Sequence, residues 1–234
     1  MIIGAGNSGT GGIASLLAKH GLPLSHEHTS PLHIKKDGLS SWISTVLGAG
    51  TFRVGRTDLE PRCRRLLVCM QVRHPRSVAR SVAGTTFGTT FEYRVRAVDW
   101  VPASYAAVWT ELGGGTKALL WWSSFCLLAE AQLGADSLAW RMEDVFHAHD
   151  GGPVQALLRA AGRAVPSQEQ LRHSLVTAAP YNSHVKNASA SLAAWDEFEG
   201  AGRDGALRRA QDDAVEVARA LAARYGYTTR RRRR

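Results

Sequence analysis

The chain has 234 residues, and its 29 lysines and arginines exceed its 20 aspartates and glutamates, which gives a formal net charge of +9. Five of these charges lie in the terminal run Arg230–Arg234, so the rest carries about +4 (9 minus 5). With 44% hydrophobic residues the chain is not a disordered one, and no apolar run is long enough to span a membrane. We expect one domain over residues 1–227 and a basic disordered tail over 228–234. A basic domain favours anionic ligands, and we find no nucleic-acid-binding motif.

A short apolar strand at Ile2–Ile3 leads into a glycine-rich turn and a helix over Thr10–His20, which Gly21 ends. Glycine lets the backbone approach a ligand closely and adopt positive φ. A turn of this kind at a helix N-terminus directs backbone N–H groups toward one point, which suits a phosphate. The alternative is a tight turn that holds no ligand. The glycines concerned are Gly6, Gly9, Gly11 and Gly12.

The next elements are less regular until one clear central strand. A continuous apolar run at Leu66–Val72 is typical of a buried parallel strand, and Pro75 then opens a helix that continues through Ser77–Ala83. The segment Gly84–Gly115 is irregular and rich in aromatic residues, so we expect it to pack as loops or to contact a substrate. Before the central strand, we predict a weak strand at Leu22–Leu24 and a short helix at Trp42–Leu47.

The second half is mainly helical. We predict a strong helix over Thr116–Leu133, in which Trp121 and Trp122 are core residues, and a strand at Ser137–Arg141. Three further helices are predicted at Gly152–Ala161, Ser167–Thr177 and Asp204–Tyr225. The spacing in the last helix places five apolar residues on one side, which we expect to be buried: Ala206, Ala210, Ala214, Val217 and Leu221. Alternating strands and helices indicate an α/β fold with three layers, in which helices cover both faces of a central parallel sheet. The three cysteines lack metal-ligand spacing, so we expect free thiols and no metal site: Cys63, Cys69 and Cys126.

Two common nucleotide loops fit the first turn incompletely. Gly4-x-Gly6-x-x-Gly9 fits the dinucleotide fingerprint and would indicate an NAD- or FAD-dependent oxidoreductase, with Glu27 as the acid after the second strand. The segment before Glu27 is a poor buried strand, however. The loop of P-loop kinases needs a lysine where this chain has Thr10.

A second motif favours another nucleotide. Arg73 directly follows the central strand, at the edge of the sheet where α/β proteins bind ligands, and Ser81 lies two helical turns further on. An arginine and a serine around one phosphate can make charge-assisted hydrogen bonds.

With these residues the chain resembles the sulfotransferase superfamily, whose enzymes use 3′-phosphoadenosine 5′-phosphosulfate (PAPS) as the sulfuryl donor. Among them it looks most like the carbohydrate-type enzymes of the Golgi. Asn7–Gly11 is similar to the 5′-phosphosulfate loop of that family, and Arg73 with Ser81 is similar to its 3′-phosphate pair. Trp140–Val145 resembles a strand end of the family, and Tyr181–Phe198 a segment with nucleotide or acceptor contacts. The closing Tyr225-Gly226-Tyr227 also fits, so the resemblance covers nearly the whole chain.

The resemblance implies a P-loop-type domain that transfers a sulfuryl group from PAPS to an acceptor hydroxyl or amine, without a metal. The implied nucleotide-binding residues are Asn7, Ser8, Gly9, Thr10, Gly11, Arg73, Ser81 and Lys186. Glu27 is the first candidate for the base, followed by His26 and then His28. These three residues could instead form an exposed polar turn.

One residue departs from the family pattern: Asn7 stands where the loop usually has lysine or arginine. Lys186 or Lys35 could supply the missing charge, and a catalytically weak protein that only binds PAPS or its product PAP is the alternative. The expected acceptor is a small molecule or a carbohydrate. The first strand begins so close to Met1 that we expect a missing upstream segment, such as a membrane anchor, and the Golgi lumen and the cytoplasm both stay open as compartments.

Overall fold

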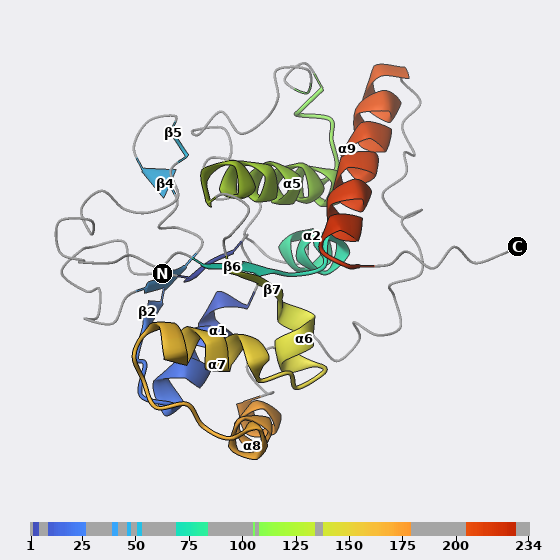
Figure 1. Ribbon diagram of the computed structural model, residues 1–234. Coiled ribbons are helices and arrows are strands. Elements are labelled where there is room, and N and C mark those ends of the chain that lie inside the picture. The colour runs from blue at the N-terminus through green and yellow to red at the C-terminus, as the bar shows by residue number, and fades with distance from the viewer. Residues whose placement is uncertain are drawn as a thin grey trace, which may run out of the picture.

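The computed structural model describes residues 2–4, 9–26, 39–41, 46–47, 51–52, 69–83, 105, 108–133, 138–178 and 205–227. Within these ranges, five short strands form one sheet, and Figure 1 shows it between two groups of helices. The strands are β1 (Ile2–Ile3), β2 (Ser25–His26), β3 (Leu39–Ser41), β6 (Cys69–Val72) and β7 (Ala139–Arg141). Their order is β2-β3-β1-β6-β7, and every neighbouring pair is parallel. A separate antiparallel pair joins β4 (Val46–Leu47) to β5 (Thr51–Phe52).

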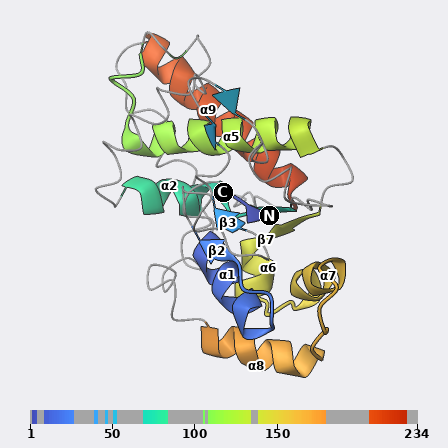
Figure 2. The same cartoon turned by 90° about the vertical axis from the view of Figure 1, so that its left-hand side faces the viewer.

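Helices cover both faces of the sheet. One face carries α2 (Pro75–Ala83), α5 (Gly114–Leu133) and α9 (Gly205–Arg224), and Figures 1 and 2 agree on this arrangement. The other face carries α1 (Thr10–Lys19), α6 (Met142–Phe146), α7 (Gly152–Ala160) and α8 (Gln168–Ala178). The predicted α/β class with a parallel sheet is therefore confirmed.

Each face of the sheet has its own hydrophobic core. On the α5 face, Trp121, Trp122 and Phe125 are buried and pack with small residues of α9. Small alanines on α9 let its backbone approach the bulky side chains of α5 closely. On the α1 face, Ile13 and Leu17 pack with buried leucines of α7 and α8. The prediction that both tryptophans belong to the core is confirmed.

The predicted long helices agree with the structure to within two residues at each end. Gly21 ends α1 with φ of 78°, as expected for a glycine after a helix. Cys69 and Cys126 are free and buried, while Cys63 lies outside the described residues. Of the predicted central strand, only Cys69–Val72 is described, and it is the strand β6.

Three details of the prediction are wrong. The second strand is Ser25–His26 rather than Leu22–Leu24, because both leucines are buried in the core beside α1 instead of pairing. Val46 and Leu47 form a strand with Thr51–Phe52, not the end of a helix. In α9, Val217 is 40% exposed although the spacing placed it on the buried side. The predicted irregular segment lies mostly outside the described residues.

Candidate functional site

The N-terminus of α1 follows directly on a left-handed glycine. Gly9 has φ of 80° and ψ of 24°, and its carbonyl accepts the first helical hydrogen bond, from the Ile13 N–H at 3.2 Å. The first turn of α1 contains no acidic residue, and among the described residues no side chain caps the helix. The N–H groups of the first turn and the helix dipole therefore make this end of α1 attractive to an anion.

Gly9 is also packed tightly against the sheet. A Cβ atom placed on Gly9 would lie 2.9 Å from the sulfur of Met142 and 3.3 Å from the side-chain nitrogen of Gln71. Gln71 is fully buried in β6, where its side-chain oxygen accepts a 3.0 Å hydrogen bond from the indole N–H of Trp140. The start of α1 thus packs against Gln71 in β6 and against Met142, which follows β7.

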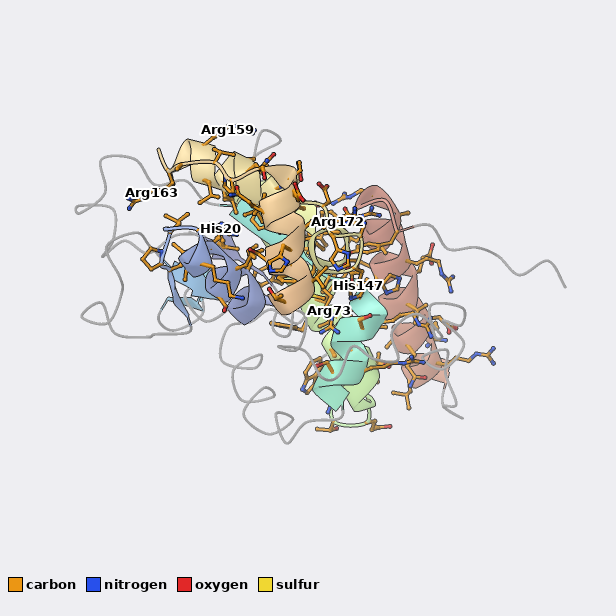
Figure 3. All side chains as sticks on the ribbon, turned by 90° about the horizontal axis from the view of Figure 1, so that it is seen from below. His20, Arg73, His147, Arg159, Arg163 and Arg172 are labelled. Atoms are coloured by element: carbon orange, nitrogen blue, oxygen red, sulfur yellow. The ribbon has the colours of Figure 1, made fainter. Side chains whose placement is uncertain are left out.

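Arg73 lies at the same end of the sheet as the start of α1. It directly follows β6, the parallel neighbour of β1, so the chain leaves both strands at the same end of the sheet. From β1 the chain continues into α1 on one face, and from β6 into α2 on the other face (Figure 1). Such a divergence opens the crevice in which α/β proteins bind ligands. Figure 3, seen from below, shows Arg73 beside the start of α2 and well away from Arg159 and Arg163.

Burial sets the charge state around Arg73. Its side chain is 5% exposed, and burial lowers its pKa, while the nearby Glu143 and Tyr227 act in the opposite direction. His74 is also buried, and burial, assisted by the positive charges of Arg76 and Arg73, lowers its pKa to about 4. His74 is therefore neutral at pH 7, and two buried guanidinium groups supply positive charge at this end of β6.

A hydrogen-bonded cluster joins the ends of β6 and β7 to the C-terminal turn. One carboxylate oxygen of Glu143 accepts the His74 backbone N–H at 3.0 Å, and the other accepts the Tyr227 hydroxyl at 2.6 Å. Arg141 donates to Asp144 through two nitrogens, one of them at 2.7 Å, and to the Gly226 carbonyl at 2.8 Å. Glu143 and Asp144 thus connect parts of the chain that are distant in the sequence.

The structure brings together only some of the residues predicted for the nucleotide site. Gly9, Thr10 and Gly11 form the start of α1, and Arg73 lies at the end of the neighbouring strand. Ser81 is partly buried in α2, about 9 Å along the helix from its first residue.

Other predicted site residues are not described. The described part of the chain excludes Asn7, Ser8, Glu27, His28, Lys35 and Lys186. His26 is the last residue of β2, but its side chain lies outside the described atoms.

Sequence reasoning missed the contribution of His74, Arg76 and Tyr227 to this region. His74 and Arg76 flank the proline after the central strand, so their position at a strand end was the available signal. Tyr227 gave no such signal, because its partner Glu143 is 84 positions away.

The described ranges contain no group of three or more histidine, cysteine, aspartate or glutamate side chains that could hold a metal ion. In the same ranges, no helix combines the length and the apolar character needed to cross a membrane. Comparisons of the chain with protein families, with curated proteins and with solved structures found no match.

Proposed function

We propose that the protein is a PAPS-dependent sulfotransferase with a single P-loop-type domain. The observation that carries the proposal is the placement of Arg73 at the end of β6 and of Gly9 at the start of the helix that follows β1. These two strands are parallel neighbours, and the helices that follow them lie on opposite faces of the sheet. A helix N-terminus beside a buried arginine offers two places for negative charge within one crevice. PAPS carries such charge at both ends of its ribose, as a 5′-phosphosulfate and a 3′-phosphate.

The order of the strands argues against the dinucleotide-binding alternative. In the dinucleotide fold, the first strand has the second and the fourth strand of the chain as neighbours. Here the neighbours of β1 are β3 and β6, which among the described residues are the third and fourth strands of this sheet in chain order, and β2 lies at the edge of the described sheet. Glu27, the candidate ribose ligand of that fold, therefore follows a strand that is not a neighbour of β1.

The tight seat of Gly9 supports the placement of the 5′-phosphosulfate at the start of α1. Because Gly9 has no side chain, the start of α1 can lie against Met142 and Gln71, and we expect its backbone N–H groups from Gly9 to Gly11 to contact the phosphate. Arg73 would hold the 3′-phosphate, together with the hydroxyl of Ser81. PAPS would supply the activated sulfuryl group.

Transfer then requires an acceptor and a base. The acceptor oxygen or nitrogen forms a bond to sulfur as the bond from sulfur to the 5′-phosphate oxygen breaks, and PAP leaves with the electron pair. The base takes the acceptor proton. We assign this role to Glu27 before His26, because a carboxylate follows the first helix in the carbohydrate-type enzymes that the chain resembles. The strand β2, which ends at His26, is parallel to β3, and β3 is parallel to β1, so the three strands end on the same side of the sheet. The edge strand lies about 10 Å from β1, which leaves room for the acceptor between the base and the donor.

The proposal is tested by ligand-dependent thermal stability. PAP should raise the unfolding temperature, and at 100 times its dissociation constant the added stability is about 2.7 kcal/mol. NAD, FAD and ATP with Mg²⁺ are the comparison ligands, and AMP is the matched control, because it differs from PAP only by the 3′-phosphate. Stabilisation by PAP but much less by AMP supports the proposal. Stabilisation by NAD or FAD, or equal affinity for PAP and AMP, would refute it.

Turnover needs a second assay. Release of PAP from PAPS, measured with a panel of sugars and small alcohols, shows whether the protein transfers the sulfuryl group. The variant Glu27→Gln should lose this release while its affinity for PAP stays within about twofold, since a base acts on the acceptor and not on the nucleotide. If the variant keeps most of its activity, Glu27 is not the base and His26→Gln is tested next. If the wild-type protein binds PAP but releases none, the domain binds the nucleotide without catalysis.

A further inference from the structure

The peptide groups on both sides of Arg73 are held by the same pair of side chains. On the C-terminal side, the His74 N–H donates to Glu143 at 3.0 Å. On the N-terminal side, the Tyr227 hydroxyl lies 3.4 Å from the Val72 carbonyl oxygen and 2.6 Å from the second oxygen of Glu143. Arg73 therefore sits between two backbone groups that Glu143 and Tyr227 contact directly.

The Tyr227 ring is itself fixed from two sides. It meets the His74 ring edge to face, with centroids 5.0 Å apart and an angle of 81° between the planes. The Arg141 guanidinium lies 5.4 Å from the centre of the same ring. Because Arg141 also holds the Gly226 carbonyl, the turn before Tyr227 is tied to the end of β7. The C-terminal turn thus closes over the end of β6.

The contact between Tyr227 and Glu143 differs from the one other tyrosine–glutamate contact described at this end of the chain. Tyr225, two residues earlier, makes a contact of the same chemistry, since its hydroxyl donates to the carboxylate of Glu130 on α5. That contact joins α9 to α5 and involves no residue at the end of β6. The two tyrosine–glutamate pairs therefore separate a purely structural role from an influence on Arg73.

We propose that Glu143 and Tyr227 are positioning residues for Arg73, which hold the end of β6 so that the Arg73 guanidinium is in place for the 3′-phosphate. This inference rests on the proposed function. It gives the residues at the C-terminal end of the domain a part in nucleotide selection. A side chain that must bind a phosphate with two hydrogen bonds needs its backbone fixed to about 0.5 Å, and two peptide contacts can provide this.

The test compares the ratio of the dissociation constants for AMP and PAP in matched variants. Tyr227→Phe removes one hydroxyl and keeps the ring, so the ratio should fall by about tenfold or more, as expected when a positioned phosphate ligand is released. Tyr225→Phe removes the equivalent hydroxyl from the other pair and should keep the wild-type ratio within about twofold. Binding is measured by calorimetry at a temperature at which each variant is folded by circular dichroism.

A second pair of variants repeats the comparison at the carboxylates. Glu143→Gln should lower the ratio, because an amide can no longer accept both hydrogen bonds through two oxygens, while Glu130→Gln should not. This pair decides the question if Tyr227→Phe does not fold. A wild-type ratio near one would refute the proposed function and, with it, this inference. A high wild-type ratio that Tyr227→Phe and Glu143→Gln leave unchanged would refute the inference alone.

Discussion

The sulfur of Met142 occupies the place that a side chain on Gly9 would need. A Cβ atom on Gly9 would come within 2.9 Å of it, and Gly9 also has the left-handed φ of 80°. Met142 opens α6 directly after β7, so the start of α1 lies against the residue that follows the last strand of the sheet. Any other residue at position 9 would therefore be destabilised twice, by the strained φ and by the close contact with Met142.

These costs can be separated with a second glycine. Gly21 has nearly the same φ, 78°, but nothing lies within 4 Å of the Cβ position. Gly21→Ala should lower the free energy of unfolding by about 1 kcal/mol, from backbone strain alone. Gly9→Ala should cost about 1–3 kcal/mol more, because the contact with Met142 adds overpacking. Urea denaturation measures both, and equal losses would show that the contact does not matter.

The core on the α5 face makes a simpler prediction. Leu119 and Leu127 lie on the same helix, but Leu119 is fully buried and Leu127 is 44% exposed. Leu119→Ala should lower the free energy of unfolding by about 2–5 kcal/mol, because it leaves a cavity between α5 and its neighbours. Leu127→Ala should change it by less than about 1 kcal/mol. Similar losses at both positions would mean that α5 does not pack as described.

The parts of the fold that were predicted correctly are those with a strong local signal. The helix α5 has a long apolar pattern around Trp121 and Trp122, and the glycine at position 21 marks the end of α1. Arg73 could be placed because a strand that is buried throughout precedes it directly. Such signals need no knowledge of the rest of the chain.

The parts that were missed depend on tertiary partners. The strands β2 and β4 have two residues each, too few for alternation to be visible, and only pairing defines them. In α9 the alanines carry little hydrophobic contrast, so the choice of buried face came out wrong for Val217. The contact between Glu143 and His74 joins positions 69 residues apart, and no local pattern encodes it.

The hydroxyl of Ser81 provides a direct test of the 3′-phosphate site. Ser81 and Ser77 lie four residues apart on α2, which places them on the same side of the helix, and both are partly buried. Ser81→Ala should weaken PAP binding by about 10- to 100-fold, the value of one hydrogen bond to a charged group, and leave AMP binding unchanged. Ser77→Ala is the matched control and should change neither. A loss with Ser77→Ala alone would place the phosphate nearer to the start of the helix.

The buried His74 predicts how stability depends on pH. Its pKa is lowered to about 4 in the folded protein, against an ordinary value of about 6.5, mainly by burial and then by Arg76 and Arg73. Between these two values the unfolded chain binds a proton that the folded protein does not. The free energy of unfolding therefore rises with pH from about 4 to about 6.5 and is lost again on acidification through this window.

The total change due to His74 is on the order of 3 kcal/mol, and a variant isolates it from other groups. His74→Asn removes the titrating ring but keeps an acceptor for the Arg76 N–H, which the ring nitrogen accepts at 3.3 Å. Urea denaturation at several pH values should give a clearly flatter curve for this variant than for the wild-type protein. His173→Asn, on the exposed side of α8, is the control for a histidine-to-asparagine change and should retain the wild-type slope. If His74→Asn keeps that slope as well, His74 is not the group that couples folding to pH.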